Sequence, residues 1–379
     1  MTIVLVYDIL YKTFYMGILD TIITNKQNES LQQFNPSEIV REIISSLKER
    51  DKEILLHRYG LEGKQQKTLA AIGEQQNLTR ERVRQIEKDL VKKLKKYGDK
   101  QEKFVSTKEF LLNIIADHGR IIAEENLLLH LNIEDQKEKN SIVFLLHLIE
   151  ELENFMDDNY KKSWVSILFK PDLLHEFTGE STKIISASKE PISTEKFLEE
   201  FKRTEFYETN KDHLADQIIL NFLELAVQIE KNVFGHWGLK DSKEIKPKDV
   251  GDKAYLVMKH YGKPRHYSEI TEMINKAGFD KKTAYKETVH NELIKDKRFI
   301  LIGRGIYALA EWGYKPGVVS EVIVDVLKRL DQPMHRDKIV EAVLKNRLVK
   351  KNTILVGLSN KKLFKKVGKN LYTLAGLAQ

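Results

Sequence analysis

Cysteine is absent from the 379 residues of this chain. Disulfide bonds, thiolate metal sites and cysteine nucleophiles are therefore excluded, and the absence fits a reducing compartment. The sequence also has no glycine-rich phosphate loop, no pair of carboxylates on a strand–helix scaffold and no nucleophile elbow. We therefore expect neither an enzyme nor a bound cofactor.

The histidines show no metal-binding pattern. His118, His130 and His147 stand alone, without a carboxylate or a second histidine at a metal-ligand spacing. His266 and His335 occupy matching places, each two residues after a proline at the expected start of a helix. A capping or surface role explains both better than a ligand role. No metal site is predicted.

One long apolar stretch, residues 3–23, raises the question of a signal peptide or a membrane span. Three charged residues interrupt it, no basic region precedes it, and no small-residue cleavage site follows it. A bilayer requires about 20 predominantly apolar residues without such interruptions. We therefore expect no membrane association. Residues 1–35 are interpreted as a packed helix or upstream extension followed by a polar linker, with Met16 as the working start.

Charge is unevenly distributed along a chain whose 41% hydrophobic and 31% charged residues are typical of a helix-rich globular protein with two to four domains. Residues 37–100 hold sixteen basic against eleven acidic residues, and residues 101–180 hold eight against sixteen. Residues 247–316 hold fourteen against nine, and residues 317–379 thirteen against five. The basic head and basic tail predict nucleic-acid contacts at both ends.

Residues 68–96 contain two short helical patterns separated by a polar break. In the second pattern apolar residues recur at i, i+3, i+7 and i+11 from Val83, which predicts one buried stripe of a helix. Thr79 stands where the N-cap of that helix is expected, and Ser37 is the expected cap of an earlier helix that begins at Pro36-Ser37. Arginine, glutamate and glutamine crowd the first turns, and their side chains suit base edges in a major groove. The pattern favours a helix-turn-helix over its alternative, a solvated, salt-bridged helix face.

The same segment resembles region four of the sigma-70 family of bacterial sigma factors. The resemblance rests on Arg58-Tyr59-Gly60-Leu61, on Thr68-Leu69 and Ile72-Gly73, and above all on TRERVRQIE from Thr79 to Glu87. In that family the domain reads the −35 promoter element of double-stranded DNA and sits on the flap of RNA polymerase.

The resemblance also implies roles for particular side chains in binding DNA. Arg80, Glu81, Arg84 and Gln85 would face bases, Arg58, Arg82 and Lys88 would contact phosphates, and Thr79 would cap the helix at the DNA.

A second pattern recurs beyond residue 100. Pro264-x-His266-x-x-x-Ile270 returns as Pro333-x-His335-x-x-x-Ile339, and weaker copies of the spacing occur earlier. Each copy predicts three helices and a β-hairpin with glycine or asparagine at its tip, which together make a winged helix. We therefore predict a mainly α fold. It would comprise a region-4 helix-turn-helix at 36–100 and winged-helix units at 104–170, 184–240, 248–314 and 317–377.

The third unit, residues 248–314, resembles the HARE-HTH domain, which occurs in the delta subunit of bacterial RNA polymerase and in several DNA-handling proteins. In these units Tyr307, Tyr372 and Trp237 fall on the inner side of a wing strand, which favours core packing over base stacking. The basic residues at or beside the wing tips are candidates for phosphate contact, with a solvated lysine loop as the alternative: Arg304, Lys366 and Lys369.

The leading hypothesis is a DNA-binding transcription factor that works with RNA polymerase core in the cytoplasm, at the nucleoid. A complete sigma factor is disfavoured, because only about 36 residues precede the region-4 segment. Two alternatives remain open: a polymerase-bound adaptor whose repeats recruit proteins, and the recognition subunit of a DNA-processing system. The target sequence, the oligomeric state and the choice between activation and repression do not follow from the sequence.

Overall fold

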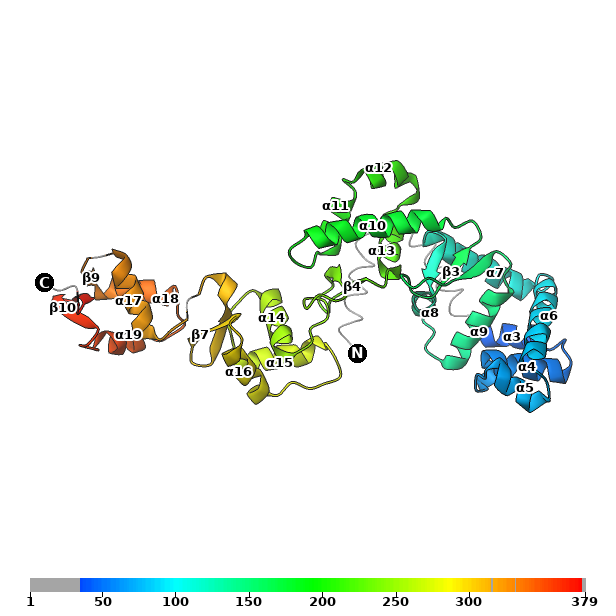
Figure 1. Cartoon of the computed structure of the whole chain (residues 1–379), viewed down its shortest axis with the longest axis horizontal. Coiled ribbons are helices and arrows are strands. Elements are labelled where there is room, and N and C mark those ends of the chain that lie inside the picture. Colours follow the sequence, from blue (N-terminus) through cyan, green and yellow to red (C-terminus); the bar gives the residue numbers. More distant parts are fainter. Residues whose placement is uncertain (1–34, 315, 331, 377–379) are drawn as a thin grey trace. The chain divides into compact units, whose positions relative to one another are not determined.

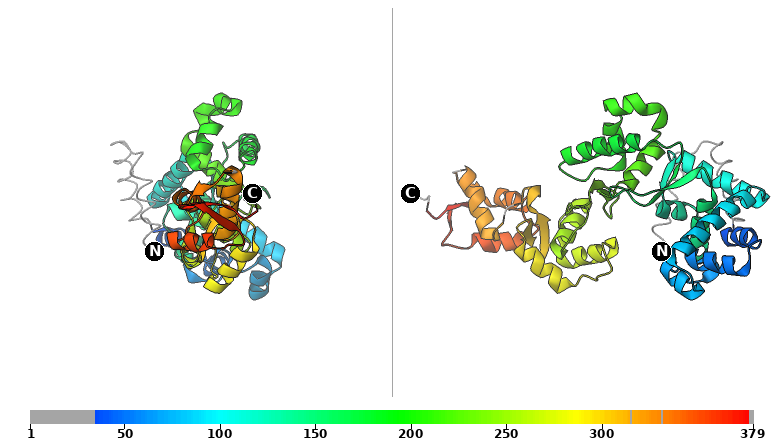
Figure 2. Two further views of the ribbon diagram at one scale, coloured as in Figure 1. Left: turned by 90° about the vertical axis from the view of Figure 1, so that its left-hand side faces the viewer. Right: turned by 45° about the vertical axis from the view of Figure 1, so that its right-hand side comes forward.

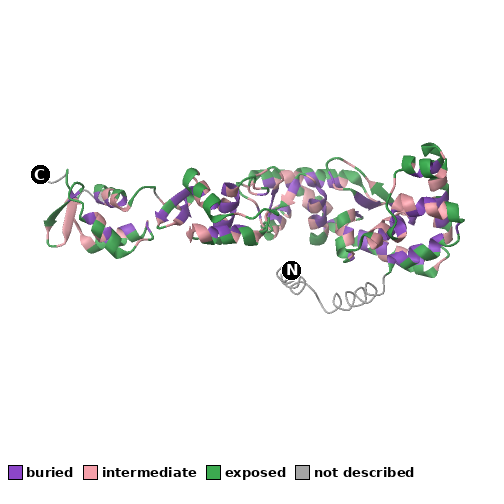
Figure 3. Ribbon diagram, turned by 90° about the horizontal axis from the view of Figure 1, so that it is seen from below, coloured by how far each residue is buried: buried purple, intermediate pink, exposed green. Residues whose placement is uncertain are grey.

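The computed structural model describes residues 35–314, 316–330 and 332–376. They form two compact units: the first holds residues up to 179 together with 204–227, and the second holds 180–203 together with residues from 228 onward. The apolar stretch 3–23 and the alternative start at Met16 lie outside the described residues. Figure 3 shows exposed residues on the outer sides of the helices and buried residues on their inner sides.

The first unit begins with four helices, drawn in blue and cyan (Figures 1 and 2). Helix α3 begins after Asn35, whose side chain accepts a hydrogen bond from the amide of Glu38, so Asn35 is the cap and not Ser37. A short 3-10 turn, η1, follows the second helix. The elements are α3 (Pro36–Ile44), α4 (Glu49–Tyr59), η1 (Leu61–Gly63), α5 (Leu69–Gln76) and α6 (Arg80–Gly98).

Helices α5 and α6 form the expected helix-turn-helix. Asn77 ends α5 in the left-handed region, with φ of 55°. A Cβ atom at Gly73 would lie 2.6 Å from the carbonyl oxygen of Leu78, so only glycine permits this close approach of α5 to the turn. Ile54, Ile72 and Val83 form one buried cluster that packs α4, α5 and α6 together.

Three helices and a three-stranded antiparallel sheet follow in the first unit. The sheet order is β1-β3-β2, and Asn154 pairs with Trp164 in the hairpin. The short strand between the first and second helices was not predicted. The elements are α7 (Glu102–Asp117), β1 (Ile121–Ala123), α8 (Glu124–His130), α9 (Gln136–Leu148), β2 (Leu152–Phe155) and β3 (Ser163–Ser166).

Later segments complete the first unit. The Asn221 amide donates to the carbonyl oxygens of His118 and Ile121, at 2.7 and 2.6 Å, and so joins α13 to the turn before β1. The elements in this part of the chain are α10 (Pro171–Ala187), whose second half belongs to the second unit, α12 (Glu205–Asn210), η2 (Lys211–His213) and α13 (Asp216–Leu225). The chain passes between the units inside α10, after residue 179, and twice inside the segment 184–240, after residues 203 and 227.

Two further groups in the second unit each show the order helix, strand, helix, helix, strand, strand. Their sheets have the orders β6-β8-β7 and β10-β11-β9. Both close on a tight turn with a residue at positive φ, Gly305 at 71° and Asn370 at 64°. The second unit contains α11 (Thr194–Phe201), β4 (Ile229–Lys231), β5 (Trp237–Leu239), α14 (Val250–Tyr261), β6 (Arg265–His266), α15 (Tyr267–Ala277), α16 (Lys286–Lys295), β7 (Phe299–Gly303), β8 (Ile306–Leu309), η3 (Ala310–Trp312), α17 (Val319–Leu330), β9 (Met334–His335), α18 (Arg336–Leu344), α19 (Lys351–Leu358), β10 (Phe364–Gly368) and β11 (Leu371–Leu374).

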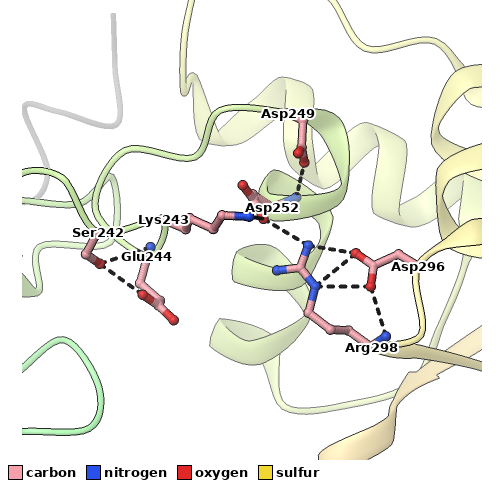
Figure 4. Close-up of polar contacts among 7 residues, drawn as sticks. All are labelled: Ser242, Lys243, Glu244, Asp249, Asp252, Asp296 and Arg298. Atoms are coloured by element: carbon pink, nitrogen blue, oxygen red, sulfur yellow. Dashed lines mark hydrogen bonds and ion pairs between the residues drawn. The ribbon is translucent and has the colours of Figure 1, made fainter.

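The group from α14 to β8 has an ionic centre (Figure 4). Asp252 is 1% exposed, and its carboxylate lies 2.9 Å from the guanidinium of Arg298 and 3.7 Å from the ammonium of Lys243. Arg298 also binds Asp296 at 2.7 Å. These contacts fix the start of β7 and the segment before α14 on the first turn of that helix.

Several expectations from the sequence agree with this architecture. The fold is mainly helical with small antiparallel sheets, and all four expected hairpins are present. His266 and His335 cap α15 and α18, as expected. Tyr307 and Trp237 are buried, whereas Tyr372 is only partly buried. No helix in the described part of the chain combines the length and apolarity needed to cross a bilayer.

Candidate nucleic-acid interface

The start of helix α6 combines a formed cap with an exposed polar surface. Thr79 has extended backbone geometry, and its hydroxyl oxygen accepts a hydrogen bond 3.2 Å long from the amide of Arg82. This contact satisfies one of the free N–H groups at the helix start. Arg80, Glu81, Arg82, Arg84, Gln85 and Lys88 are all exposed.

The opposite side of α6 holds the helix in place. Val83, Leu90 and Leu94 are at most 6% exposed and pack into two hydrophobic clusters. Because these residues follow a helical period, their burial directs the charged first turns to solvent. The exposed side chains thus stand on a helix whose orientation is fixed by its core.

The exposed side chains contact one another. Arg84 donates two hydrogen bonds to Glu81, from Nη2 at 2.6 Å and from Nε at 2.9 Å. Arg82 donates to the amide oxygen of Gln85 at 3.3 Å. The hydrogen bonds from Arg84 are the main cause of a lowered pKa of Glu81, and the same contact raises the pKa of Arg84. Both residues are therefore charged around neutral pH.

Arg58 differs from the other expected phosphate contacts. It is partly buried and donates a 3.0 Å hydrogen bond from Nε to Glu87 of α6. Its guanidinium carbon also lies 5.9 Å from the centre of the Tyr59 ring. Arg58 thus has a structural contact between α4 and α6, and its role at DNA stays a prediction.

The wing-tip candidates lie on the hairpins of the second unit. Arg304, Lys366 and Lys369 are exposed, and Arg304 and Lys369 occupy the turns β7–β8 and β10–β11. Beside the last hairpin lies a cavity of about 450 Å³, which no motif or spacing in the sequence indicated. Its lining combines apolar and basic residues, including Leu355, Phe364, Lys361, Lys365, Lys366 and Tyr372.

The described residues hold no cluster of metal-ligand side chains. Among them no three histidine, aspartate or glutamate side chains gather as metal ligands would. His147 packs between Tyr59 and Trp164, with ring-centre distances of 5.4 and 4.9 Å. Burial, assisted by the charge of Lys162, lowers the pKa of His147 to about 4, so its ring is neutral at physiological pH.

Comparison with known proteins gives this surface a family context. Residues 43–96 match the family model "Sigma-70, region 4". The chain is 34% identical over 85 residues to the RNA polymerase principal sigma factor HrdD of Streptomyces griseus, and the match covers 22% of this chain and 26% of that protein. It is 43% identical over 58 residues to the RNA polymerase sigma factor SigA of Nostoc sp., which is 15% of each chain.

A third relative, the RNA polymerase sigma factor RpoD of Helicobacter pylori, is 42% identical over 62 residues, which is 16% of this chain and 9% of that protein. The chain thus spans about a quarter or less of the length of these three relatives. The resemblance is confirmed over the matched segment: residues 43–96 form a sigma-70 region 4 domain.

Proposed function

We propose that this protein binds double-stranded DNA through helix α6 and acts as a transcription factor together with bacterial RNA polymerase. The observation that carries the proposal is the capped, exposed start of α6 within a segment that matches sigma-70 region 4. The relatives that share this segment are named as RNA polymerase sigma factors. The expected target is a −35-like promoter element, and the protein is not an enzyme.

Base reading falls to the first two turns of α6. Arg80 and Arg84 would donate to guanine, while Glu81 and Gln85 would read neighbouring base pairs. A good bidentate pair discriminates against a wrong base by about 1–3 kcal/mol. Arg82, Lys88 and Arg58 would contact phosphates and set the register without reading sequence.

The later groups would add affinity without sequence preference. The helix and strand order from α14 onward supports their assignment as winged-helix units, the first of them HARE-HTH-like. The exposed lysines at the last hairpin would neutralise phosphates, and their contribution would fall as salt rises.

The test is a pair of binding curves on the full chain. Anisotropy with a −35-type duplex and a scrambled duplex of equal length, at low and moderate salt, measures sequence preference. A pull-down with core RNA polymerase, followed by footprinting of the DNA that accompanies it, tests the partnership. Preference for the −35-type duplex and recovery of polymerase support the proposal, whereas equal affinity for both duplexes would refute base reading.

One observation favours a second candidate, a polymerase-bound adaptor. Residues 101–180 hold eight basic against sixteen acidic residues, and a surface of that sign suits a basic protein partner better than DNA. An adaptor would bind polymerase with no preference between the two duplexes. A recognition subunit of a DNA-processing system would show the preference but would not recover polymerase.

A further inference from the structure

Helix α3 packs more extensively on α9 than on any other described element. Its apolar side, which includes Ile39, Val40, Ile43 and Ile44, is buried in a cluster that also contains residues of α9 such as Phe144 and Leu145. The family match begins only at residue 43, so most of α3 and the whole of α9 lie outside it. These two helices therefore pack together beside the matched domain.

Polar contacts fix α9 in register on the domain. Glu138 accepts a 3.0 Å hydrogen bond from the backbone amide of Ser37 at the start of α3. The side-chain amide of Asn140 donates to the carbonyl oxygen of Gly60 at 2.8 Å. Such contacts have a defined direction, so they fix α9 in one position on this face, whereas apolar packing alone would permit several positions.

Aromatic packing extends the same interface. Tyr59, at the end of α4, lies with its ring centre 4.8 Å from that of Phe144 in an edge arrangement. Burial, followed by the nearby charge of Glu87, raises the pKa of the Tyr59 hydroxyl far above its ordinary value. Helix α9 also packs against α4, η1 and α6, so it contacts three elements of the matched domain in addition to α3.

The result is one continuous core, and its buried residues run from Ile39 to Trp164. Among the described residues, the first large apolar side chain that is strongly exposed is Leu129, which is 72% exposed and lies outside the domain. From α3 to α6 no large apolar side chain is more than partly exposed.

We propose that α9 is an intramolecular partner of the region-4 domain and covers its apolar face. This face of the domain is filled by the chain itself, so the helix-turn-helix keeps its form without a second protein. This inference rests on the proposed function, because it concerns how RNA polymerase binds the protein. The polymerase does not occupy the face that α9 covers and contacts the protein through another surface. The charged start of α6 stays open, because its side chains are exposed while α9 is in place.

Hydrogen exchange on the full chain tests the proposal. In the free protein we expect the amides of α3 and α9 to exchange at similarly slow rates, as one cooperative body. Added core RNA polymerase should leave both helices protected. Fast exchange of α9 in the free protein, or loss of protection in α9 as polymerase protects α3, would overturn the proposal.

A double variant, Glu138→Ala with Asn140→Ala, loosens the contact without removing apolar residues. It removes two hydrogen bonds that hold α9 in place and should speed exchange in α3 roughly tenfold. Lys139→Ala, on the same helix, is the matched control and should leave α3 unchanged. If α3 exchanges equally fast in both variants, these hydrogen bonds do not hold α9 in place, and the proposal is contradicted.

The DNA arm keeps the two proposals apart. Adding a −35-type duplex should slow exchange at the start of α6 and leave α9 as it was. If the duplex leaves exchange at α6 unchanged while α3 and α9 stay protected, the proposed function is refuted. The same result would support the cover of this face by α9.

Discussion

Arg84 and Glu81 form a two-point ion pair on the exposed side of α6, with contacts of 2.6 and 2.9 Å. The pair lies one helical turn apart, so the helix itself holds the two side chains together. In free protein the Glu81 carboxylate accepts the same two N–H groups that would donate to a guanine edge. Under the proposed function, base reading by Arg84 would exchange one bidentate partner for another.

Replacing this arginine should flatten the sequence preference. Arg84→Ala removes one bidentate donor, and discrimination between the −35-type and scrambled duplexes should fall by about 1–3 kcal/mol. Lys92→Ala, on the exposed face of the same helix eight residues later, is the control, because it removes a charge but no expected base contact. Anisotropy at fixed salt gives both values. An equal loss on both duplexes for Arg84→Ala would refute its base-reading role.

Glu81 should restrain binding to the wrong DNA. Glu81→Gln removes a negative charge close to the expected phosphates and frees Arg84 from its ionic partner. Affinity for the scrambled duplex should therefore rise, while the preference for the −35-type duplex shrinks. Titration of both duplexes at one salt concentration measures the two changes. Weaker binding to the scrambled duplex would contradict this role.

Charge at the last hairpin should matter equally for every duplex. The double variant Lys365→Ala with Lys366→Ala should weaken both duplexes alike and lower the slope of log affinity against log salt by about 1.8, if each lysine neutralises one phosphate. The variant Lys328→Ala with Arg329→Ala removes the same charge from exposed positions on α17 and is the control. An identical slope change in both variants would show a general charge effect and no contact at the hairpin.

Burial of His147 should make the first unit sensitive to acid. Its pKa is lowered from 6.5 to about 4, so between these values the unfolded chain binds a proton that the folded chain does not. Folding stability contributed by this group is therefore complete above pH 6.5 and decreases as the pH falls toward 4, by roughly 3 kcal/mol in total.

The measurement is urea unfolding at several pH values between 4 and 7. As the pH falls across this range, His147→Phe should lose less folding stability than the parent chain. The exposed His213→Gln in the same unit should keep the parent's dependence. A parent-like pH dependence in His147→Phe would assign the acid sensitivity to other groups.

The ionic centre of the α14–β8 group should be costly to break. Arg298→Met leaves the carboxylate of Asp252, which is 1% exposed, without its nearest cation and should destabilise the group by about 3–5 kcal/mol. Adding Asp252→Asn removes the buried charge and should recover part of that loss. Thermal unfolding of the parent, single and double variants measures both steps. Equal stability of the single and double variants would contradict the coupling.

Local features were predictable from the sequence because their causes are local. The Thr79 cap depends on a hydrogen bond to an amide three residues away, and the hairpin tips need residues that accept positive φ. The choice of Ser37 as the first cap was wrong, since the Asn35 side chain accepts from the amide of Glu38 and Pro36 already occupies the first helical position. Neighbouring candidates of similar propensity are separated only by the final geometry.

Long-range features could not be predicted in the same way. The hydrogen bond between Asn140 and Gly60 joins residues 80 positions apart, and no periodic pattern records such a contact. Strands β6 and β9 contain two residues each, too few for an alternating signal. The exposed face of α6 was predictable by its period, whereas the cover of α3 by α9 needed the structure.

The position of α6 on DNA can be measured directly, because the chain has no cysteine of its own. Lys88→Cys carrying a tethered iron chelate would cleave DNA only close to the recognition helix, on the duplex that the full chain selects from a random pool. We expect cuts confined to a few base pairs within the selected element, and Lys338→Cys on α18 should not give the same cuts. Cleavage spread evenly along the duplex, or absent while the protein stays bound, would contradict the placement of α6 in a DNA groove.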